Sequence, residues 1–446
     1  MLDRHDIIVA PATASGGAIT VIRVSGDGCI ECCDRIFRGR SALVDAAPNT
    51  IHYGRIVDGS REVDDVLVSL FRAPHSYTGE DSVEISVHGS RYIVAEVLRL
   101  LIASGARMAS AGEFTIRAYL AGKMDLSQAE AVADMIAADS KAAHALAVTQ
   151  MKGGYSSSLH DLRSQLLDVA SLLELELDFS EEDVEFADRT QLAAMLDSIS
   201  AEVERLAASF HSGNALKNGI AVAIVGQPNV GKSTLLNRLT GEERAITSEI
   251  AGTTRDTIEE SCDIDGVRFR FIDTAGIRQT EDVVERLGIE RTLKAIADAR
   301  IIISLSEAGV AAESIEAREG QTLIEVVNKV DIISGLAVGS VADGRIYISA
   351  KTGAGIDGLR ARLRGTVDTA GAYTGETIVT NARHFEALQR ASAALTAARK
   401  ALETGLSGEL LSEEIREVLN ILGEITGTVT SEEVLQNIFG KFCIGK

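Results

Sequence analysis

The sequence predicts an α+β N-terminal domain, an all-α helical domain, and an α/β domain inserted into the helical one. Strand-like segments fill the N-terminal part, and Ala, Leu, Glu and Gln dominate from Asp125 to His211. A continuous apolar strand begins at Ile220, and a helical pattern returns after Thr380. The simplest arrangement is one helical domain interrupted by an α/β domain. The predicted domains are 1–121, 122–215, 216–371 and 372–446, of which the second and fourth are the two parts of the helical domain.

The N-terminal part combines strand and helix signals. Segments 18–24, 63–71 and 83–87 are rich in β-branched residues, and several are bounded by Gly, Pro, Asn or Asp. Segment 92–103 instead has apolar residues at helical spacing. A small α+β domain follows from this mixture.

The helical part is predicted from one long amphipathic stripe and two later segments. Leucine or valine recurs every three or four residues at Leu159, Leu162, Leu166, Val169, Leu173 and Leu177. The later helices are expected over 387–402 and 412–422.

The inserted part begins with a strand of buried character. Segment 220–225 is continuously apolar and ends in a glycine, as expected of a parallel strand covered on both faces. Strands and helices then alternate to about residue 370, which is typical of a doubly wound α/β domain.

Charge and hydropathy limit the classes of function. The 446 residues carry a formal charge of −21, from 44 basic and 65 acidic side chains. Long-range repulsion from phosphates argues against a general nucleic-acid binder, so any RNA contact needs a local basic patch or a second protein. No apolar run approaches the ~20 residues of a bilayer helix, and the segment 1–6 lacks the features of a signal peptide. We expect a cytoplasmic protein without a membrane partner.

The cysteines do not form a disulfide framework. Cys29, Cys32 and Cys33 cluster, but no second Cys or His pair follows at a spacing typical of zinc sites. Buried thiols on a helix are therefore preferred to a metal site.

A phosphate-binding loop follows the strand that ends at Val225. Gly226-Gln227-Pro228-Asn229-Val230-Gly231-Lys232-Ser233-Thr234 fits G-x-x-x-x-G-K-[ST], between a strand and a helix as the motif requires. Glycines let backbone N–H groups converge on phosphates, Lys232 reaches the β- and γ-phosphates as a catalytic residue, and the Ser233 hydroxyl ligates Mg²⁺. Asn229, Val230, Gly231, Lys232, Ser233 and Thr234 are predicted to bind the nucleotide.

Further segments occur in the order typical of a P-loop GTPase (G) domain. Asp273-Thr274-Ala275-Gly276 ends a strand, with Asp273 placed to hold Mg²⁺ through water and Gly276 to meet the γ-phosphate. Thr254, between the two motifs, is predicted to ligate Mg²⁺ in a loop that GTP orders.

The nucleobase is predicted to be guanine. Asn328-Lys329-Val330-Asp331 ends an apolar strand, and the Asp331 carboxylate can accept hydrogen bonds from guanine N1–H and the 2-amino group. Adenine does not offer such a pair of donors. Ser349-Ala350-Lys351 can add a backbone contact to guanine O6.

The residue that orients the attacking water is not the usual glutamine, because Ile277 follows the D-x-x-G segment. Glu281, Asp282 and Glu285 are the candidates for that role. Asn229 allows two interpretations: it ligates a monovalent cation that offsets transition-state charge, or it only forms a turn.

Several segments together resemble the MnmE (TrmE) family of tRNA-modification GTPases. They are Gly226–Thr234, Gly252–Asp256, Asp273–Arg278, Tyr77–Asp81, Leu120–Ala131 and the closing Phe442-Cys443-Ile444-Gly445-Lys446. The C-terminal Cys-x-Gly-Lys is the most specific of these. The loop Ala12–Gly17 departs from the Pro-Pro-Gly-Arg-Gly-Gly type that many members carry.

The resemblance implies a homodimer whose N-terminal domain binds a tetrahydrofolate derivative in the 5,10-methylene or 5-formyl form. It implies an FAD-dependent partner, MnmG, in a heterotetramer or larger complex. Together they would install an aminomethyl-type (carboxymethylaminomethyl) group at C5 of the tRNA wobble uridine, with glycine or ammonia as amine donor. GTP hydrolysis would require Mg²⁺, be stimulated by K⁺, and act through G-domain dimerisation.

The resemblance also assigns individual residues. Glu285 matches the water-orienting glutamate, and Cys443 has either a chemical or a structural role. The residues expected around K⁺ are Asn229, Ser248, Ile250 and Thr253, of which Ser248 and Thr253 also join the GTP site. The residues expected to contact the folate are Arg23, Glu80, Lys123 and Lys446.

Two other functions are compatible with parts of the sequence. An assembly or signalling GTPase that has lost the folate site would keep the same phosphate loop. An interaction scaffold with an inactive G domain is disfavoured by the presence of Lys232, Ser233, Asp273 and Glu285.

Overall fold

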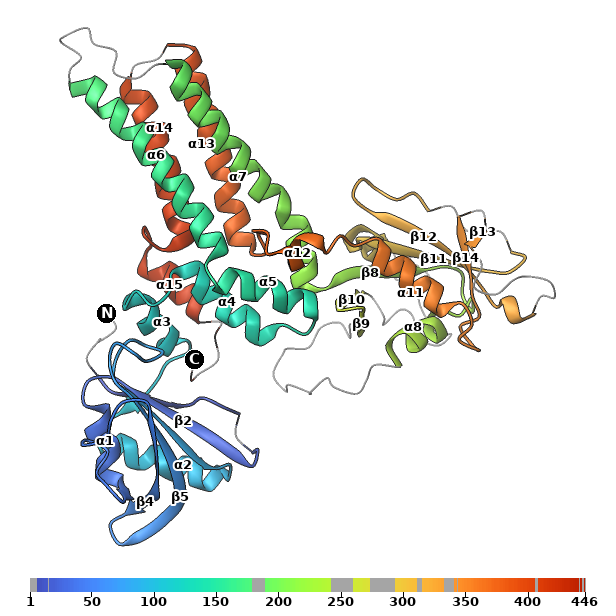
Figure 1. The fold of residues 1–446 in the computed structure, drawn as a ribbon. Helices are drawn as coiled ribbons and strands as arrows, with labels where there is room; N and C mark the ends of the chain where they lie inside the picture. The colour runs from blue at the N-terminus through green and yellow to red at the C-terminus, as the bar shows by residue number, and fades with distance from the viewer. Residues whose placement is uncertain are drawn as a thin grey trace. The chain divides into compact units, whose positions relative to one another are not determined.

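The computed structural model describes residues 6–14, 16–178, 189–241, 260–272, 293–310, 315–332, 341–342, 344–405, 408–440, 442 and 445. The chain forms two compact units. The first consists of Met1–Ala133, Leu159–Leu167 and Arg416–Lys446, and the second of Asp134–Ser158 and Asp168–Ile415. The predicted fold class, with its α+β, helical and inserted α/β parts, is confirmed (Figure 1).

The first unit contains a seven-stranded sheet in the order β3-β4-β5-β6-β2-β1-β7. Neighbouring strands are antiparallel except for the parallel pair β1–β7. The strands are β1 (Ile8–Pro11), β2 (Ile19–Ser25), β3 (Phe37–Gly39), β4 (Thr50–Asp58), β5 (Arg61–Phe71), β6 (Ser82–His88) and β7 (Arg107–Met108).

Two helices cover one face of this sheet. Helices α1 (Cys29–Ile36) and α2 (Arg91–Ala103) share a core with alternate strand residues such as Val66 and Val68. Cys29, Cys32 and Cys33 lie on α1 and are buried, as predicted. Burial raises the pKa of each of the three thiols.

A smaller core in the same unit joins sequence-distant helices. Helices α3 (Glu113–Leu120) and α15 (Glu432–Phe439) and the start of α4 (Leu126–Ala137) pack around Phe439 and Phe442. The Tyr119 hydroxyl donates to the Gly427 carbonyl oxygen over 2.7 Å. These contacts bring the C-terminal segment of the chain to α3.

The second unit contains most of the helical part. Among its helices, α7 and α13 lie side by side (Figure 1), with Phe210 and Phe385 stacked at 4.4 Å between ring centroids. Among the described residues, no helix is both long and apolar enough to cross a bilayer. The helices are α5 (Lys141–Met151), α6 (Gly154–Asp178), α7 (Arg189–Asn218), α12 (Ala370–Thr374), α13 (Ala382–Glu403) and α14 (Gly408–Thr426), with parts of α4, α6 and α14 assigned to each unit.

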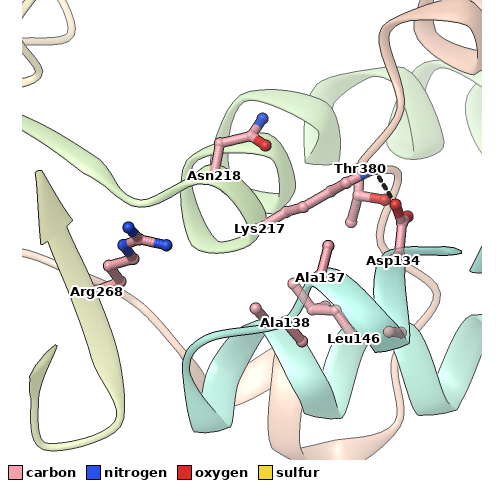
Figure 2. A pocket seen from close by; sticks show the side chains of 10 residues that line it. Asp134, Ala137, Ala138, Leu146, Lys217, Asn218, Arg268 and Thr380 are labelled. Carbon is pink, nitrogen blue, oxygen red and sulfur yellow. Dashed lines mark ion pairs between the residues drawn. The ribbon is translucent and has the colours of Figure 1, made fainter. Parts of the chain in front are cut away.

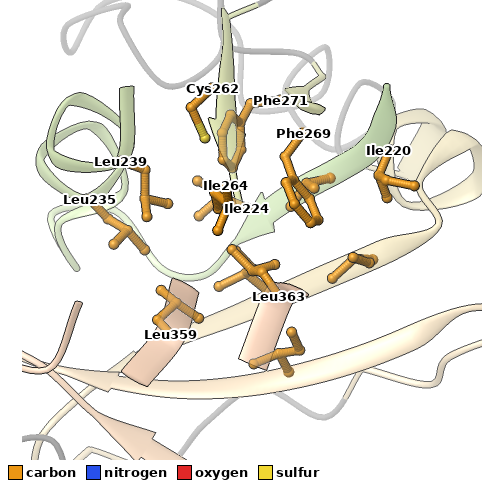
Figure 3. Packing of buried hydrophobic residues seen from close by; sticks show 14 of the residues in the cluster. Ile220, Ile224, Leu235, Leu239, Cys262, Ile264, Phe269, Phe271, Leu359 and Leu363 are labelled. Carbon is orange, nitrogen blue, oxygen red and sulfur yellow. The ribbon is translucent and has the colours of Figure 1, made fainter. Parts of the chain in front are cut away.

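The inserted part of the second unit is built on a second seven-stranded sheet, ordered β13-β14-β12-β11-β8-β10-β9. Its inner pairs are parallel, whereas β9 and β13 at the edges pair antiparallel. Phe269 and Phe271 of β10 lie in the core with leucines of two helices (Figure 3). The elements are β8 (Ile220–Val225), α8 (Lys232–Gly241), β9 (Glu260–Ile264), β10 (Val267–Phe271), β11 (Ile301–Glu307), β12 (Thr322–Asn328), the 3-10 turn η2 (Val330–Ile332), β13 (Val341–Ala342), β14 (Arg345–Tyr347) and α11 (Ile356–Gly365).

The inserted part is entered and left at one place. Gly213, near the end of α7, lies so close to the returning chain that a Cβ there would be 2.3 Å from the Val379 carbonyl oxygen. The Asn214 side chain donates to the Thr380 carbonyl oxygen over 3.1 Å. Because the two connections lie side by side, the helical part can continue after the insertion without rearrangement.

Candidate functional site

The phosphate loop joins β8 to α8, and its backbone requires glycine. Gly226 and Gly231 have φ angles of 150° and 103°. A Cβ at Gly231 would lie 2.3 Å from Asn328 Nδ2. The Lys232 ammonium donates to the carbonyl oxygens of Gly226 (2.6 Å) and Gln227 (2.9 Å), so it lies against the loop. With α8 beginning at Lys232, the helix N-terminus and this ammonium can serve the same phosphates.

Other predicted loop residues have distinct positions. Asn229 has a φ of 61°, a left-handed conformation that asparagine tolerates better than most residues. This backbone shape agrees with the turn interpretation of Asn229, and its predicted ligation of a cation stays a prediction. Val230 is buried, and Ser233 and Thr234 lie in the first turn of α8.

Asn328 connects the phosphate side of the site to the base side. Its carboxamide is 2% exposed, donates to the Val230 carbonyl oxygen (2.8 Å) and accepts from the Ala350 N–H (2.9 Å). Both partners belong to loops that the sequence predicted to bind nucleotide. The structure therefore brings the phosphate loop and the 349–351 loop together around one side chain.

Asp331 is exposed, and its carboxylate interacts with the 349–351 loop. A hydrogen bond from the Ser349 side chain lowers the pKa of Asp331, and the charge of Lys351 adds to this effect. The carboxylate is thus ionised and able to accept from two neighbouring N–H groups, as guanine recognition requires.

Lys329 forms an ion pair that sequence reasoning did not find. Its Nζ lies 2.7 Å from Glu307 Oε2, and its φ is 61°. Glu307 ends β11, and strand register places it beside Asn328 of β12. The sequence does contain a signal for this pair. Glu307 and Asn328 each end an apolar run, and neighbouring parallel strands end at the same edge of a sheet, which brings Lys329 close to Glu307.

Several predicted residues lie outside the described part of the chain. For the nucleotide and cation sites they are Ser248, Ile250, Thr253, Thr254, Asp273, Thr274, Ala275, Gly276, Glu281, Asp282 and Glu285. For the C-terminal tail they are Cys443 and Lys446. Their predicted roles stay predictions.

The predicted folate residues of the first unit lie around one loop, 77–81. Glu80 Oε2 accepts from the Ser25 hydroxyl (3.0 Å) and from Arg117 (3.2 Å). Gly79, the preceding residue, lies against Lys123, whose Cγ would be 3.5 Å from a Cβ at position 79. The Lys123 ammonium donates to the Pro74 carbonyl oxygen over 2.9 Å.

Arg23 reaches the same loop from β2. Its guanidinium lies 5.1 Å from the centre of the Tyr77 ring and 5.7 Å from that of Phe114, within the range of cation–π attraction. It also pairs with Glu84 of β6 at 2.9 Å. Arg23, Glu80 and Lys123 therefore come from separate elements but converge near residues 77–80.

The C-terminal tail also reaches this unit. Gly445 is buried with a φ of 99°, and a Cβ there would lie 2.1 Å from the Pro11 carbonyl oxygen. Pro11 ends β1, directly before the 12–17 loop. Only a glycine allows the tail this approach, which explains the residue before Lys446 in the closing motif.

A pocket of about 160 Å³ lies elsewhere in the second unit (Figure 2). Its wall includes Lys217, which pairs with Asp134 at 2.7 Å, and Arg268, which pairs with Asp139. None of the predicted site residues lines it. The pocket instead marks where β10 meets helices α4 and α5.

Two family models match the chain, together with curated relatives of nearly equal length. The MnmE helical domain matches residues 126–443, and the GTP-binding protein TrmE N-terminus matches residues 7–123. The tRNA modification GTPase MnmE of Bacteroides thetaiotaomicron is 49% identical over 99% of this chain and 100% of its own length. Proteins with the same description from Flavobacterium psychrophilum and Porphyromonas gingivalis are 49% and 48% identical over 99% of this chain, and 99% and 98% of their own lengths.

Asp331→Asn is expected to weaken GDP binding about 100-fold or more, because an amide cannot accept both guanine donors. The same variant should gain affinity for xanthosine diphosphate, whose C2 carbonyl accepts from the new amide N–H. Titration with fluorescent GDP and xanthosine diphosphate measures both effects. Asp357→Asn, an exposed acid of α11, is the matched control and should bind GDP like the wild type. Unchanged GDP affinity in Asp331→Asn would refute the assignment of Asp331 to the base.

Proposed function

The chain belongs to the MnmE family of tRNA modification GTPases, and we propose that it acts with an FAD-dependent MnmG partner on the tRNA wobble uridine. It is a GTP hydrolase. In this proposal the two proteins add an aminomethyl-type group at C5 of that base, in the cytoplasm. The observation that carries it is one chain holding a guanine-nucleotide loop and, in its other unit, the Arg23–Glu80–Lys123 cluster.

The Arg23–Glu80–Lys123 cluster is proposed to bind a tetrahydrofolate derivative. A pterin ring presents adjacent N–H donors, which suit the Glu80 carboxylate, and a glutamate tail, which suits Arg23 or Lys123. The ring of Tyr77 beside Arg23 offers an apolar surface next to these charges. When bound, the folate would supply the one-carbon unit. Lys446 joins this proposal because Gly445 lies against Pro11 of the same unit.

A homodimer is proposed through the open face of the first unit's sheet. Tyr53 of β4 and Leu67 of β5 lie opposite each other and are 66% and 48% exposed, and Ile51 is 68% exposed. The same face continues across β6 to Arg23, because Ile51 is in register with Ser69, Ser69 with Glu84, and Glu84 with Arg23. An apolar patch rimmed by charged groups favours a protein partner, and a second copy would cover it beside the folate cluster.

GTP hydrolysis is proposed to need Mg²⁺ at Ser233 and K⁺ beside Asn229. Ser233 is the second residue of α8, directly after Lys232, where the motif places a magnesium ligand. Ile277 has no side-chain amide that could orient the attacking water, so Glu285 is assigned that role. K⁺ is assigned to offset negative charge on the phosphates. GTP turnover would then drive opening and closing of G domains, not the carbon chemistry itself.

The proposed function predicts a specific loss of modified nucleosides. Deleting the gene should remove the aminomethyl-type C5 modification from wobble uridine, and the wild-type chain should restore it. Mass spectrometry of nucleosides from digested tRNA measures the change. A complementing Glu80→Gln chain should fail, whereas Asp357→Asn should succeed. An unchanged nucleoside profile in the deletion strain would overturn the proposal and favour an assembly or signalling GTPase.

The cation proposal predicts that GTP turnover is faster in KCl than in NaCl of equal ionic strength, on the order of 100-fold, the lower end of the effect of one lost transition-state donor. Phosphate release measured in both salts tests this. Choline chloride at the same ionic strength controls for general screening. Equal rates in KCl and NaCl would remove K⁺ from the mechanism.

The dimer proposal predicts that Ile51→Glu separates the protomers, because a desolvated and unpaired carboxylate opposes association. Light scattering after size-exclusion chromatography measures the mass in solution. Ile102→Glu is the matched control, since Ile102 is 44% exposed on α2, away from β4. A wild-type monomer, or an Ile51→Glu variant that stays dimeric, would contradict the proposed face.

A further inference from the structure

A buried ion network lies beneath Glu80, with Arg117 at its centre. The Arg117 side chain projects from α3 and is 5% exposed. Its Nη1 lies 3.2 Å from Glu80 Oε2 and 3.4 Å from Oε1, and donates to the Asp6 backbone oxygen over 2.8 Å. Its Nη2 donates to the Asp6 carboxylate and, over 3.3 Å, to Glu113. The guanidinium is therefore held in one orientation by partners on several sides.

Glu80 keeps acceptor capacity on its open side. Its side chain is 20% exposed, and Oε2 already accepts from Ser25 and Arg117. Among the described residues, the only hydrogen bond that Oε1 accepts is the long one from Arg117, over 3.4 Å. A carboxylate oxygen can accept two hydrogen bonds, so Oε1 has room for a donor from a ligand.

We infer that Arg117 is the positioning residue that holds Glu80 in the plane where its carboxylate receives the N–H donors of a pterin ring. This inference rests on the proposed tetrahydrofolate site. A ligand with two adjacent donors needs both carboxylate oxygens at fixed places. Arg117 Nη1 lies within 3.4 Å of both Glu80 oxygens, and Asp6 and Glu113 hold Nη2, so the planar guanidinium fixes the carboxylate. A lysine at 117 would keep the charge but not this planar set of donors.

Charged and polar groups surround Glu80 and Arg117. They are Asp6, Asp81, Glu113, Arg107, Cys29 and the hydroxyls of Ser25 and Thr78. Burial raises the pKa of Asp6 and of Glu113, but hydrogen bonds from the arginines outweigh it and lower both. Without Arg117, Asp6 and Glu113 would keep Arg107 as a partner, whereas Glu80 would lose its guanidinium partner.

Arg107 provides a matched control within the same network. It pairs with Asp6 and with Glu113 (2.9 Å from Nη1), and in the described part of the chain it forms no hydrogen bond or ion pair with Glu80. A purely structural network would make the two arginines equivalent for ligand binding. If Arg117 positions Glu80, ligand binding should depend on Arg117 and not on Arg107.

The test is calorimetric titration of the full chain with 5-formyltetrahydrofolate. Arg117→Gln should weaken binding about 10–100-fold, as expected for a lost charge-assisted contact. Arg117→Lys should recover only part of the affinity, and Arg107→Gln should bind nearly as the wild type. Circular dichroism of each variant confirms folding.

A Glu80→Gln background keeps the inference testable if Arg117→Gln folds poorly. There, adding Arg117→Lys should change affinity much less than it does in the wild type, because the coupled partner is gone. Equal losses of affinity from Arg117→Gln and Arg107→Gln, or additive effects of Glu80→Gln and Arg117→Lys on affinity, would overturn this inference but not the proposed folate site. Absence of binding by the wild-type chain would overturn the proposed folate site, and the inference with it.

Discussion

The two loops that are proposed to bind the nucleotide are held together by the buried side chain of Asn328. It donates to Val230 in the phosphate loop and accepts from Ala350 in the loop beside the base. Gly231 has no side chain because Asn328 Nδ2 occupies that space. A smaller residue at 328 would leave a carbonyl oxygen and an N–H buried without partners, and each such group costs about 1–3 kcal/mol. One side chain therefore holds together the two loops that are proposed to bind the phosphates and the base.

An acidic protein that binds anionic ligands needs basic side chains placed locally at its binding sites. The net charge is −21, yet Lys232 lies in the phosphate loop at the start of α8, and Arg23 lies within cation–π range of two aromatic rings. Arg117 is embedded among three carboxylates and is thereby fixed rather than free. Buried pairs of this kind add little net stability but give orientation, which is what a ligand site requires. General repulsion and local attraction therefore coexist.

The sequence predicted what depends on local patterns. Strand β8, the phosphate loop and helix α6 follow from apolar runs and glycine spacing, and the structure has them within a few residues of the prediction. Strand β4 was not singled out, because its exposed Ile51 and Tyr53 alternate with polar residues and a glycine on the covered side. The pairs Lys329–Glu307 and Arg117–Glu80 join residues 22 and 37 positions apart. Strand register brings the first pair together and helix packing the second, so predicting either pair needs the fold as well as the local sequence pattern.

The proposed use of GTP requires a route from the nucleotide to the helices, and β10 supplies one. This strand ends at Phe271, two residues before Asp273, and the carbonyl oxygen of Gly266, just before the strand, accepts from the Ala142 N–H of α5 over 2.9 Å. Arg268 of the same strand pairs with Asp139 before α5. The two chain segments that connect the insertion to the helical part also lie side by side, at Gly213 and Val379. A hydrogen bond and an ion pair therefore link β10 to α5, and through them a displacement of β10 would reach the helical part.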